Sequence, residues 1–141
     1  MNSQARTRPA APAWPVGPAA ITLADVCAAI GADIVWCPDL TTPVAGVVAA
    51  DLMSDVLVDA RPGYVLVTGL ANVQTVRTAA IADLAAVVFA RGKAVPPEVL
   101  MLAREARLPV FMSQRSLFET AGRLYGVFTG APAGADRRPP P

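Results

Sequence analysis

The sequence predicts a three-layer α/β domain, a sandwich in which helices cover both faces of a mostly parallel central sheet. Short apolar runs alternate along the chain with segments whose apolar residues recur at helical spacing. Strands that are apolar on both faces are typical of parallel sheets covered by helices on two sides. Hydrophobic residues make up 54% of the 141 residues and charged residues only 16%, so the chain can bury one core.

The predicted domain occupies residues 21–130, between two tails. Eight of the fourteen prolines lie in residues 1–20 and 131–141, where alanine, glycine and arginine supply most of the rest. This composition is typical of disorder, because it offers too little apolar surface to offset chain entropy. Trp14 in the first tail either docks on the domain or a partner or, as we favour, is a stray aromatic of a disordered segment.

The first predicted elements are a helix and a short strand. Thr22-Leu-Ala-Asp25 has the capping-box pattern that begins a helix, and apolar residues between Leu23 and Ile30 recur at i, i+3, i+4 and i+7 until Gly31. A strand is predicted over Asp33 to Cys37. Because an irregular segment with two prolines follows, we expect this helix and strand at an edge of the sheet or in antiparallel orientation.

Two further strands flank a short helix. Val44 to Ala50 is a β-branched apolar run typical of a buried strand. Asp51 is predicted to cap the helix that follows, which stops before the turn at Arg61-Pro-Gly63. Tyr64 to Thr68 then forms a third strand.

The alternation continues through two more helices. Asn72 is predicted to cap a helix that reaches about Asp83, and Ala85 to Ala90 makes the fourth strand. Pro96-Pro97 opens the next helix. The apolar residues expected to face the core are Val73, Val76, Ala80 and Leu84 on the first helix and Val99, Leu102, Ala103 and Ala106 on the second.

The last predicted elements are a strand and a helix. Pro109 precedes a strand from Val110 to Ser113. Ser116-Leu-Phe-Glu119 is a second capping box that starts the final helix. A last strand or extension is predicted over Gly126 to Phe128.

Charge and residue types exclude several function classes. Residues 21–130 carry eight Lys or Arg and ten Asp or Glu, so the domain offers no electrostatic footprint for nucleic acid. The sequence has no histidine, which removes the commonest general base and neutral metal ligand. Cys27 and Cys37 form no CxxC pair and are expected to be ordinary buried thiols. No metal or cofactor is predicted.

The sequence also indicates a cytoplasmic protein. No stretch approaches the 18 or more apolar residues that cross a bilayer. The N-terminal prolines interrupt the apolar run that a secretory signal needs. Two cysteines without a disulfide framework fit a reducing compartment, so we expect no membrane partner.

Polar residues gather where the predicted strands end, which is where ligands bind in an open parallel sheet. Two predicted helices also begin there, and their unpaired N–H groups favour anions. Arg91, Lys93 and Arg115 would be charge partners for a phosphate or nucleotide. The predicted ligand-binding residues are Thr68, Gly69, Asn72, Arg91, Gly92, Lys93, Ser113, Arg115 and Ser116. The alternative is that these are ordinary loop and capping residues.

Asp51, Ser54 and Asp55 form a compact acidic group at the end of a predicted strand. They would bind a metal, neutralise an arginine such as Arg77 or act in catalysis, whereas helix capping and solvation explain them equally well. The glycine-rich phosphate loops of kinases and dinucleotide oxidoreductases do not occur in the sequence. We therefore expect no enzymatic activity.

The order of several segments between about Ile21 and Phe128 resembles the DRTGG domain family. The segments are Gly46-Val-Val-Ala-Ala-Asp-Leu-Met-Ser-Asp55, Arg61-Pro-Gly-Tyr-Val-Leu-Val-Thr-Gly-Leu70, Val87-Val-Phe-Ala-Arg-Gly-Lys93 with Pro96, and Leu108-Pro-Val110 leading to Phe118-Glu-Thr-Ala-Gly122. The namesake Asp-Arg-Thr-Gly-Gly string is not present, and Arg91-Gly92-Lys93 follows the fourth strand instead.

The resemblance implies a small α/β regulatory module, usually a homodimer. Similar domains accompany the CBS domains of regulated pyrophosphatases, whose assembly binds adenine nucleotides, and precede some phosphotransacetylase domains. They also resemble the non-catalytic N-terminal domain of HPr kinase. This chain looks like the stand-alone subgroup, which resembles proteins encoded beside iron-only hydrogenases and NADH-oxidising subunits.

The function expected from this resemblance is a non-enzymatic regulatory domain for a metabolic or redox system. Its ligand would be an adenine nucleotide or another phosphorylated metabolite. The alternative is a ligand-free interaction subunit of an electron-transfer or hydrogenase assembly.

Overall fold

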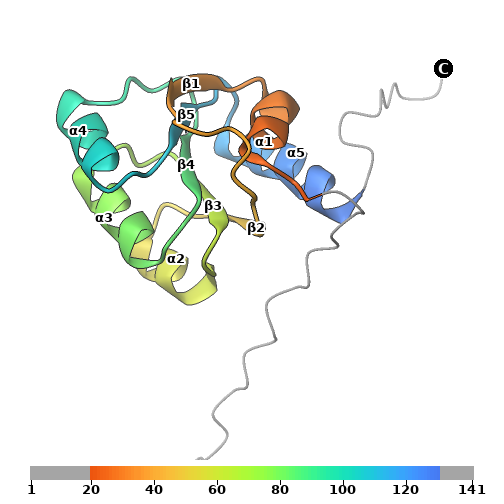
Figure 1. Ribbon diagram of the computed structural model, residues 1–141, viewed down its shortest axis with the longest axis horizontal. Helices are drawn as coiled ribbons and strands as arrows, with labels where there is room; N and C mark the ends of the chain where they lie inside the picture. The colour runs from red at the N-terminus through yellow and green to blue at the C-terminus, as the bar shows by residue number, and fades with distance from the viewer. Residues whose placement is uncertain (1–19, 131–141) are drawn as a thin grey trace, which may run out of the picture.

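The computed structural model of the protein describes residues 20–130, which form a five-stranded sheet with helices on both faces (Figure 1). The predicted three-layer α/β fold is confirmed. The two predicted tails, with Trp14, lie outside the described residues apart from Ala20.

The strands lie in the order β1-β5-β4-β3-β2. The four strands β2 to β5 are parallel to one another, while β1 is antiparallel to β5 at one edge, as the sequence indicated. All four parallel strands therefore end at the same edge of the sheet. The strands are β1 (Asp33–Trp36), β2 (Gly46–Ala49), β3 (Tyr64–Thr68), β4 (Ala86–Phe89) and β5 (Val110–Met112).

The five helices divide between the two faces. Helices α1 and α5 cover one face, and α2, α3 and α4 cover the other (Figure 1). The helices are α1 (Leu23–Ile30), α2 (Met53–Asp59), α3 (Val73–Ile81), α4 (Pro97–Glu105) and α5 (Leu117–Thr129).

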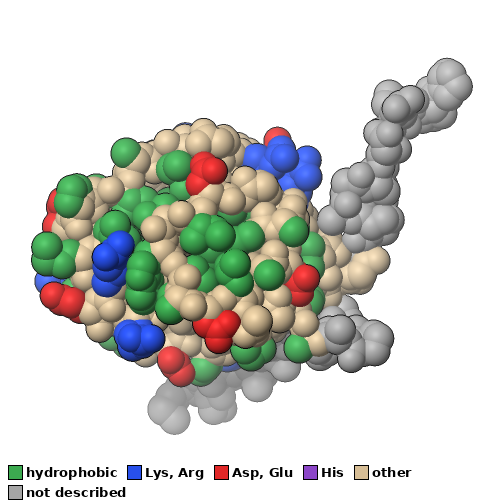
Figure 2. All heavy atoms as spheres, turned by 45° about the horizontal axis from the view of Figure 1, so that its top comes forward, with side chains coloured by type: hydrophobic (Ala, Val, Ile, Leu, Met, Phe, Trp, Pro, Cys, Tyr) green, Lys and Arg blue, Asp and Glu red, His purple; other side chains and the backbone are tan. Residues whose placement is uncertain are grey.

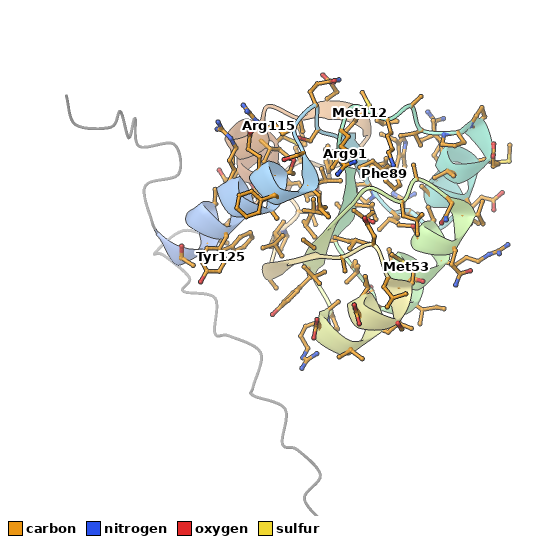
Figure 3. The ribbon with its side chains drawn as sticks, turned by 180° about the vertical axis from the view of Figure 1, so that it is seen from behind. Met53, Phe89, Arg91, Met112, Arg115 and Tyr125 are labelled. Carbon is orange, nitrogen blue, oxygen red and sulfur yellow. The ribbon has the colours of Figure 1, made fainter. Side chains whose placement is uncertain are left out.

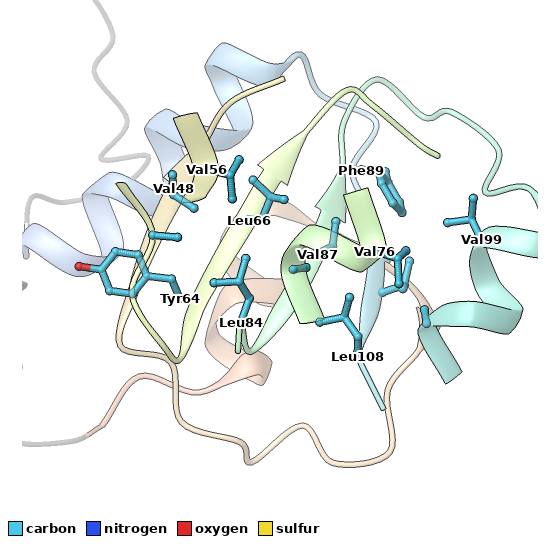
Figure 4. Close-up of a cluster of buried hydrophobic side chains, with 14 residues drawn as sticks. Val48, Val56, Tyr64, Leu66, Val76, Leu84, Val87, Phe89, Val99 and Leu108 are labelled. Atoms are coloured by element: carbon cyan, nitrogen blue, oxygen red, sulfur yellow. The ribbon is translucent and has the colours of Figure 1, made fainter. Parts of the chain in front are cut away.

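Alternate residues of each strand enter two separate cores, because successive side chains of a strand point to opposite faces. In β3, Val65 and Val67 join the cluster under α1 and α5, whereas Leu66 joins the cluster under the other three helices. Figure 4 shows this second cluster, in which Val76 of α3 and Val99 of α4 face the sheet. β3 and β4 are buried on both sides, which explains their continuous apolar runs.

Two predicted helix caps are confirmed. The Thr22 hydroxyl accepts from the Asp25 N–H at 3.4 Å, and the Asp25 carboxylate accepts from the Thr22 N–H at 2.8 Å. The Asn72 side chain accepts from the Thr75 N–H at 2.9 Å. These local hydrogen bonds satisfy N–H groups at the helix ends that have no partner within the helix.

Four local predictions were wrong. The segment from Gly126 to Phe128 is not a strand but the last part of α5, because Phe128 lies one turn beyond Leu124 and both enter the core at helical spacing. Ala79, not Ala80, faces the core from α3, and Ala106 at the end of α4 is exposed instead of facing the core. The second capping box forms only in part: Ser116 accepts from the Glu119 N–H at 3.1 Å, but the Glu119 carboxylate turns to arginines.

The two cysteines, which were predicted to be ordinary buried thiols, are half-buried. Both lie at the rim of the core beneath α1 and α5, where neighbouring side chains cover them only in part. Burial raises the pKa of the Cys27 thiol to about 11, and Cys37 adds to this shift. Cys27 is therefore a protonated, weakly nucleophilic thiol at neutral pH.

Helices α3 and α4 end in the same way, on a residue with left-handed backbone. Asp83 (φ 56°) and Arg107 (φ 54°) follow the last turns, and the next N–H groups, of Leu84 and Leu108, reach back to Ala79 and Ala103 carbonyls at 3.0 and 2.8 Å. This hydrogen bond is typical of helix ends where glycine is the preferred residue.

We expect Arg107→Gly to raise the free energy of unfolding by about 0.5–1 kcal/mol, because glycine adopts a positive φ without the penalty that a Cβ causes. The control is Arg104→Gly, which removes the same side chain from right-handed helix in α4 and should lower stability by up to about 1 kcal/mol. Urea titrations of both variants measure the difference. A loss of stability in Arg107→Gly would contradict the prediction.

Candidate functional site

The candidate site lies at the edge where β2 to β5 end. Figure 3 shows Arg91 and Arg115 together at this edge, near Phe89 and Met112 at the ends of β4 and β5. The Arg91 N–H donates to the Arg115 carbonyl at 2.8 Å, so the segments after these two strands are joined by a hydrogen bond. The sheet thus brings most of the predicted ligand-binding residues to one edge.

Asp51 organises the part of the site after β2 and β3. One of its carboxylate oxygens accepts from the Gly69 N–H at 2.7 Å and from the buried Thr68 hydroxyl at 2.9 Å. The Lys93 ammonium donates to the Gly69 carbonyl at 2.7 Å. The exposed Arg91 lies close enough to act on Asp51 electrostatically. Two cations therefore act on the one carboxylate that holds the Gly69 N–H.

The hydrogen bond from Gly69 lowers the pKa of Asp51 below its ordinary value. The Thr68 hydroxyl and the charges of Lys93 and Arg91 act in the same direction, whereas partial burial opposes them. Hydrogen bonds to a carboxylate stabilise its charged form, so Asp51 stays ionised at neutral pH.

This arrangement corrects the prediction for the acidic group. Asp51 does not cap α2, because the capping position is Leu52, which makes no side-chain hydrogen bond to the helix. Ser54 and Asp55 are exposed in the first turn of α2. Arg77 is exposed on α3, and the cations that act on Asp51 are Lys93 and Arg91 instead.

The part of the site after β5 is built on a pair of buried hydroxyls. The Ser113 and Thr120 side-chain oxygens lie 2.9 Å apart, and Ser113 also accepts from the Arg115 N–H at 3.2 Å. The Arg115 guanidinium donates to the Ile30 carbonyl at 3.3 Å and pairs with the Glu119 carboxylate. Arg115 is therefore already partnered, unlike the open charge partner that the sequence suggested.

A cavity of about 510 Å³ lies beside Arg115 and Glu119, between the end of α1 and the start of α5. Glu119, whose pKa Arg115 lowers, contributes a negative charge to its wall. The residues lining the cavity are Ile30, Gly31, Gln114, Arg115, Ser116 and Glu119.

Arg91 and Gly92 connect the two parts through two successive left-handed residues, with φ of 67° and 61°. The Gly92 N–H donates to the Ser113 carbonyl at 2.7 Å. The Gln114 side chain lies so close over Gly92 that a Cβ there would collide with its amide group. Gln114 follows β5 but is not among the predicted ligand-binding residues, because its place over Gly92 depends on the pairing of β4 with β5.

The remaining predicted residues serve local structure. Asn72 uses its side-chain oxygen to accept from both the N–H and the hydroxyl of Thr75. Ser116 caps α5. Capping explains these two side chains fully.

Within residues 20–130, no group of three or more His, Cys, Asp or Glu side chains is placed to hold a metal ion. None of the helices in this range combines the length and the apolar character that crossing a membrane requires. Figure 2 shows one face of the molecule, on which acidic and basic side chains are scattered among hydrophobic ones without a broad field of one sign.

Comparison with known proteins identifies the family. No curated protein matches the chain. Among solved structures, the chain is similar to the CBS and DRTGG domains of the regulatory region of Clostridium perfringens pyrophosphatase complexed with its activator, diadenosine tetraphosphate. The TM-score is 0.61 at 17% identity, and the match covers 77% of this chain and 46% of that one, which shows a shared fold. The model of the DRTGG domain matches residues 25–127. The chain belongs to the DRTGG domain family.

Proposed function

We propose that this chain is a non-enzymatic regulatory domain that binds a nucleotide or another phosphorylated ligand at the ends of β3, β4 and β5. The observation that carries the proposal is a pair of cations at one strand end: Lys93 donates to the Gly69 carbonyl, and both Lys93 and Arg91 act on the Asp51 carboxylate that holds the Gly69 N–H. The Arg91 N–H also donates to the carbonyl of Arg115, which lines the cavity at the start of α5. Both cations are exposed. Lys93 has further donors beyond the one that it gives to Gly69.

The similar pyrophosphatase region, whose activator carries phosphates, supports an adenine nucleotide as the first ligand to test. We propose the same ligand class for this chain, together with a homodimeric state and a cytoplasmic setting, where the free thiols Cys27 and Cys37 stay reduced. The regulated system would be metabolic or redox, including a hydrogenase-type assembly.

A catalytic role for the acidic group is not favoured. The lowered pKa of Asp51 makes it a weak base, and the same oxygen already holds Gly69 and Thr68. Ser54 and Asp55 lie on the exposed side of α2. Asp51 is better suited to holding the strand ends in place for a ligand.

Thermal unfolding of the full chain against a panel of ligands tests the proposal. The panel contains adenine and guanine nucleotides, dinucleotides, diadenosine tetraphosphate and acyl phosphates, with sulfate at matched ionic strength as a control. We expect a dose-dependent rise in Tm with at least one compound, since a ligand at 100 times its Kd stabilises by about 2.7 kcal/mol.

Variants then locate the site. We expect Lys93→Ala and Arg91→Ala each to raise the Kd of that compound at least tenfold, which corresponds to about 1.4 kcal/mol for a lost charged contact. Arg104→Ala, on an exposed part of α4, is the matched control and should bind unchanged. If no compound shifts the Tm of the folded protein, the ligand proposal fails, and the ligand-free interaction subunit takes its place.

A further inference from the structure

Helix α5 carries two exposed aromatic side chains on its outer side. Phe118 is 88% exposed and Tyr125 is 58% exposed, although Leu124 and Phe128 of the same helix are buried. Figure 3 shows Tyr125 on this helix, away from the sheet. Gly122 lies between the two aromatics at helical spacing, and a Cβ added to it would meet no atom within 4 Å. The helix therefore presents an apolar strip with an open notch at its centre.

A row of alternating charge runs beside this strip. Arg115, Glu119 and Arg123 follow one another at intervals of four residues and therefore lie on one side of the helix. Glu119 pairs with Arg115, and the Arg123 guanidinium lies 3.6 Å from the same carboxylate. The outer surface of α5 thus has an aromatic flank and a charged flank.

We infer that this surface binds a second copy of the chain, with the two α5 helices packed antiparallel about a twofold axis near Ala121 and Gly122. The inference deepens the proposed function, on which it rests, because it names the surface of the proposed homodimer. A twofold interface uses the same patch on both subunits, so the patch must complement itself.

The residues of α5 meet this condition. Phe118 and Tyr125 lie at equal distances on either side of the centre, so each Phe118 would face Tyr125 of the second copy. Glu119 and Arg123 lie on either side of Ala121 in the same way, so the carboxylate of one copy would face the guanidinium of the other. A twofold axis places the aromatic flank of one helix against the aromatic flank of the other, and the charged flank against the charged flank. Aromatic side chains then face each other, and each charge faces an opposite charge.

The centre of the surface allows the close approach that such packing needs. Gly122 has no side chain to separate the two backbones, and Ala121 is small. α5 is about 20 Å long at 1.5 Å per residue. One pair of helices of this length makes a small interface, so we expect a dimer that dissociates on dilution.

Charge favours a second copy over the chain's own ends as the occupant. Residues 1–19 and 131–141 carry four arginines and one acidic residue, Asp136. Such segments would complement Glu119 but would repel Arg115 and Arg123. A second α5 offers both signs in the matching order.

Charge reversal in the full-length chain tests the inference. Analytical ultracentrifugation over a range of concentrations should show a monomer–dimer equilibrium for the unmodified chain. Glu119→Arg and Arg123→Glu, each alone, would place like charges opposite one another and should raise the dimer Kd at least tenfold. An equimolar mixture of these two variants should restore the dimer, because each like-charged pair then becomes an opposite-charged one.

Two further variants separate pairing from folding. Phe118→Ser leaves the charges intact and should also weaken the dimer, whereas Glu98→Arg, an equal charge change on exposed α4, should leave it unchanged. Thermal unfolding checks that every variant is folded.

The outcomes distinguish the inference from the proposal on which it rests. A dimer that persists in both charge variants, or that mixing fails to restore, overturns pairing through α5 but leaves a homodimer. A chain that stays monomeric at all concentrations overturns both, and the ligand panel above is unaffected by either result.

Discussion

Phe111→Ala is expected to lower the free energy of unfolding by about 3–5 kcal/mol. Phe111 is fully buried in β5, beside Val88 of β4, and belongs to the cluster under α1 and α5. Truncation removes most of a large side chain from a packed site that cannot collapse completely, so a cavity remains. Because a domain of this size is stable by about 5–15 kcal/mol, this one change removes a large fraction of its stability.

Urea unfolding measures this effect as a lower midpoint at an unchanged m-value. Met101→Ala is the control, because Met101 is 63% exposed on α4 and its truncation should change stability by less than about 0.5 kcal/mol. If the alanine variant does not fold, Phe111→Leu, which should lower the free energy of unfolding less, is measured instead. Equal effects at Phe111 and Met101 would contradict the assignment of the core.

Asp51→Ala is expected to lower the free energy of unfolding by about 1–2 kcal/mol at pH 7. The substitution leaves the Gly69 N–H and the buried Thr68 hydroxyl without their acceptor. Asp51 is exposed, so its attraction to Lys93 and Arg91 adds only a few tenths of a kcal/mol. Asp51→Asn should cost less, because its amide oxygen can accept the same two hydrogen bonds.

The effect of Asp51 depends on pH with a definite sign. Its pKa is lowered in the folded chain, so the charged form stabilises the fold at every pH above the unfolded value of about 3.9. This contribution is lost as the pH falls through the lowered folded pKa. The stability difference between the unmodified chain and Asp51→Asn should therefore shrink between about pH 5 and pH 2.

Urea titrations at several pH values check this expectation. Asp55→Asn is the matched control, because Asp55 is exposed on α2, and it should change stability by less than about 0.5 kcal/mol. A difference for Asp51→Asn that stays constant down to pH 2 would show that the charge of Asp51 contributes nothing to stability.

Local sequence patterns were sufficient where one helix end or one strand decides the outcome. The caps at Thr22 and Asn72 form between groups that lie only three residues apart. β3 and β4 were found because burial on both faces requires continuous apolar runs, such as Tyr64–Thr68, whereas the edge strand β1 is partly exposed. The cations after β4 were placed correctly at the sheet edge because parallel strands end together.

The same patterns failed where a side chain has two partners within reach. Asp51 directly precedes α2 in the sequence, where a capping residue is expected. However, β2 and β3 pair with Ala49 beside Val67, which places Asp51 beside Gly69. The Asp51 carboxylate therefore accepts the hydrogen bond from the Gly69 N–H. Glu119 fits a capping box, but Arg115 and Arg123 lie one turn away on each side. The local sequence from Gly126 to Phe128 is compatible with a strand. It is helical because α5 continues through it and buries Phe128 in the core.

The sequence by itself therefore determined the α/β class, the order of the elements and the chemistry available at the strand ends. Hydrophobic periodicity and helix capping depend on residues that are close in the sequence, so both can be recognised from the sequence alone. Only the tertiary structure decided which groups meet: Asp51 with Gly69, Arg115 with the distant Ile30 carbonyl, and Gln114 over Gly92. These contacts depend on strand register and on which face each helix covers, and both are set by the packing of the whole domain.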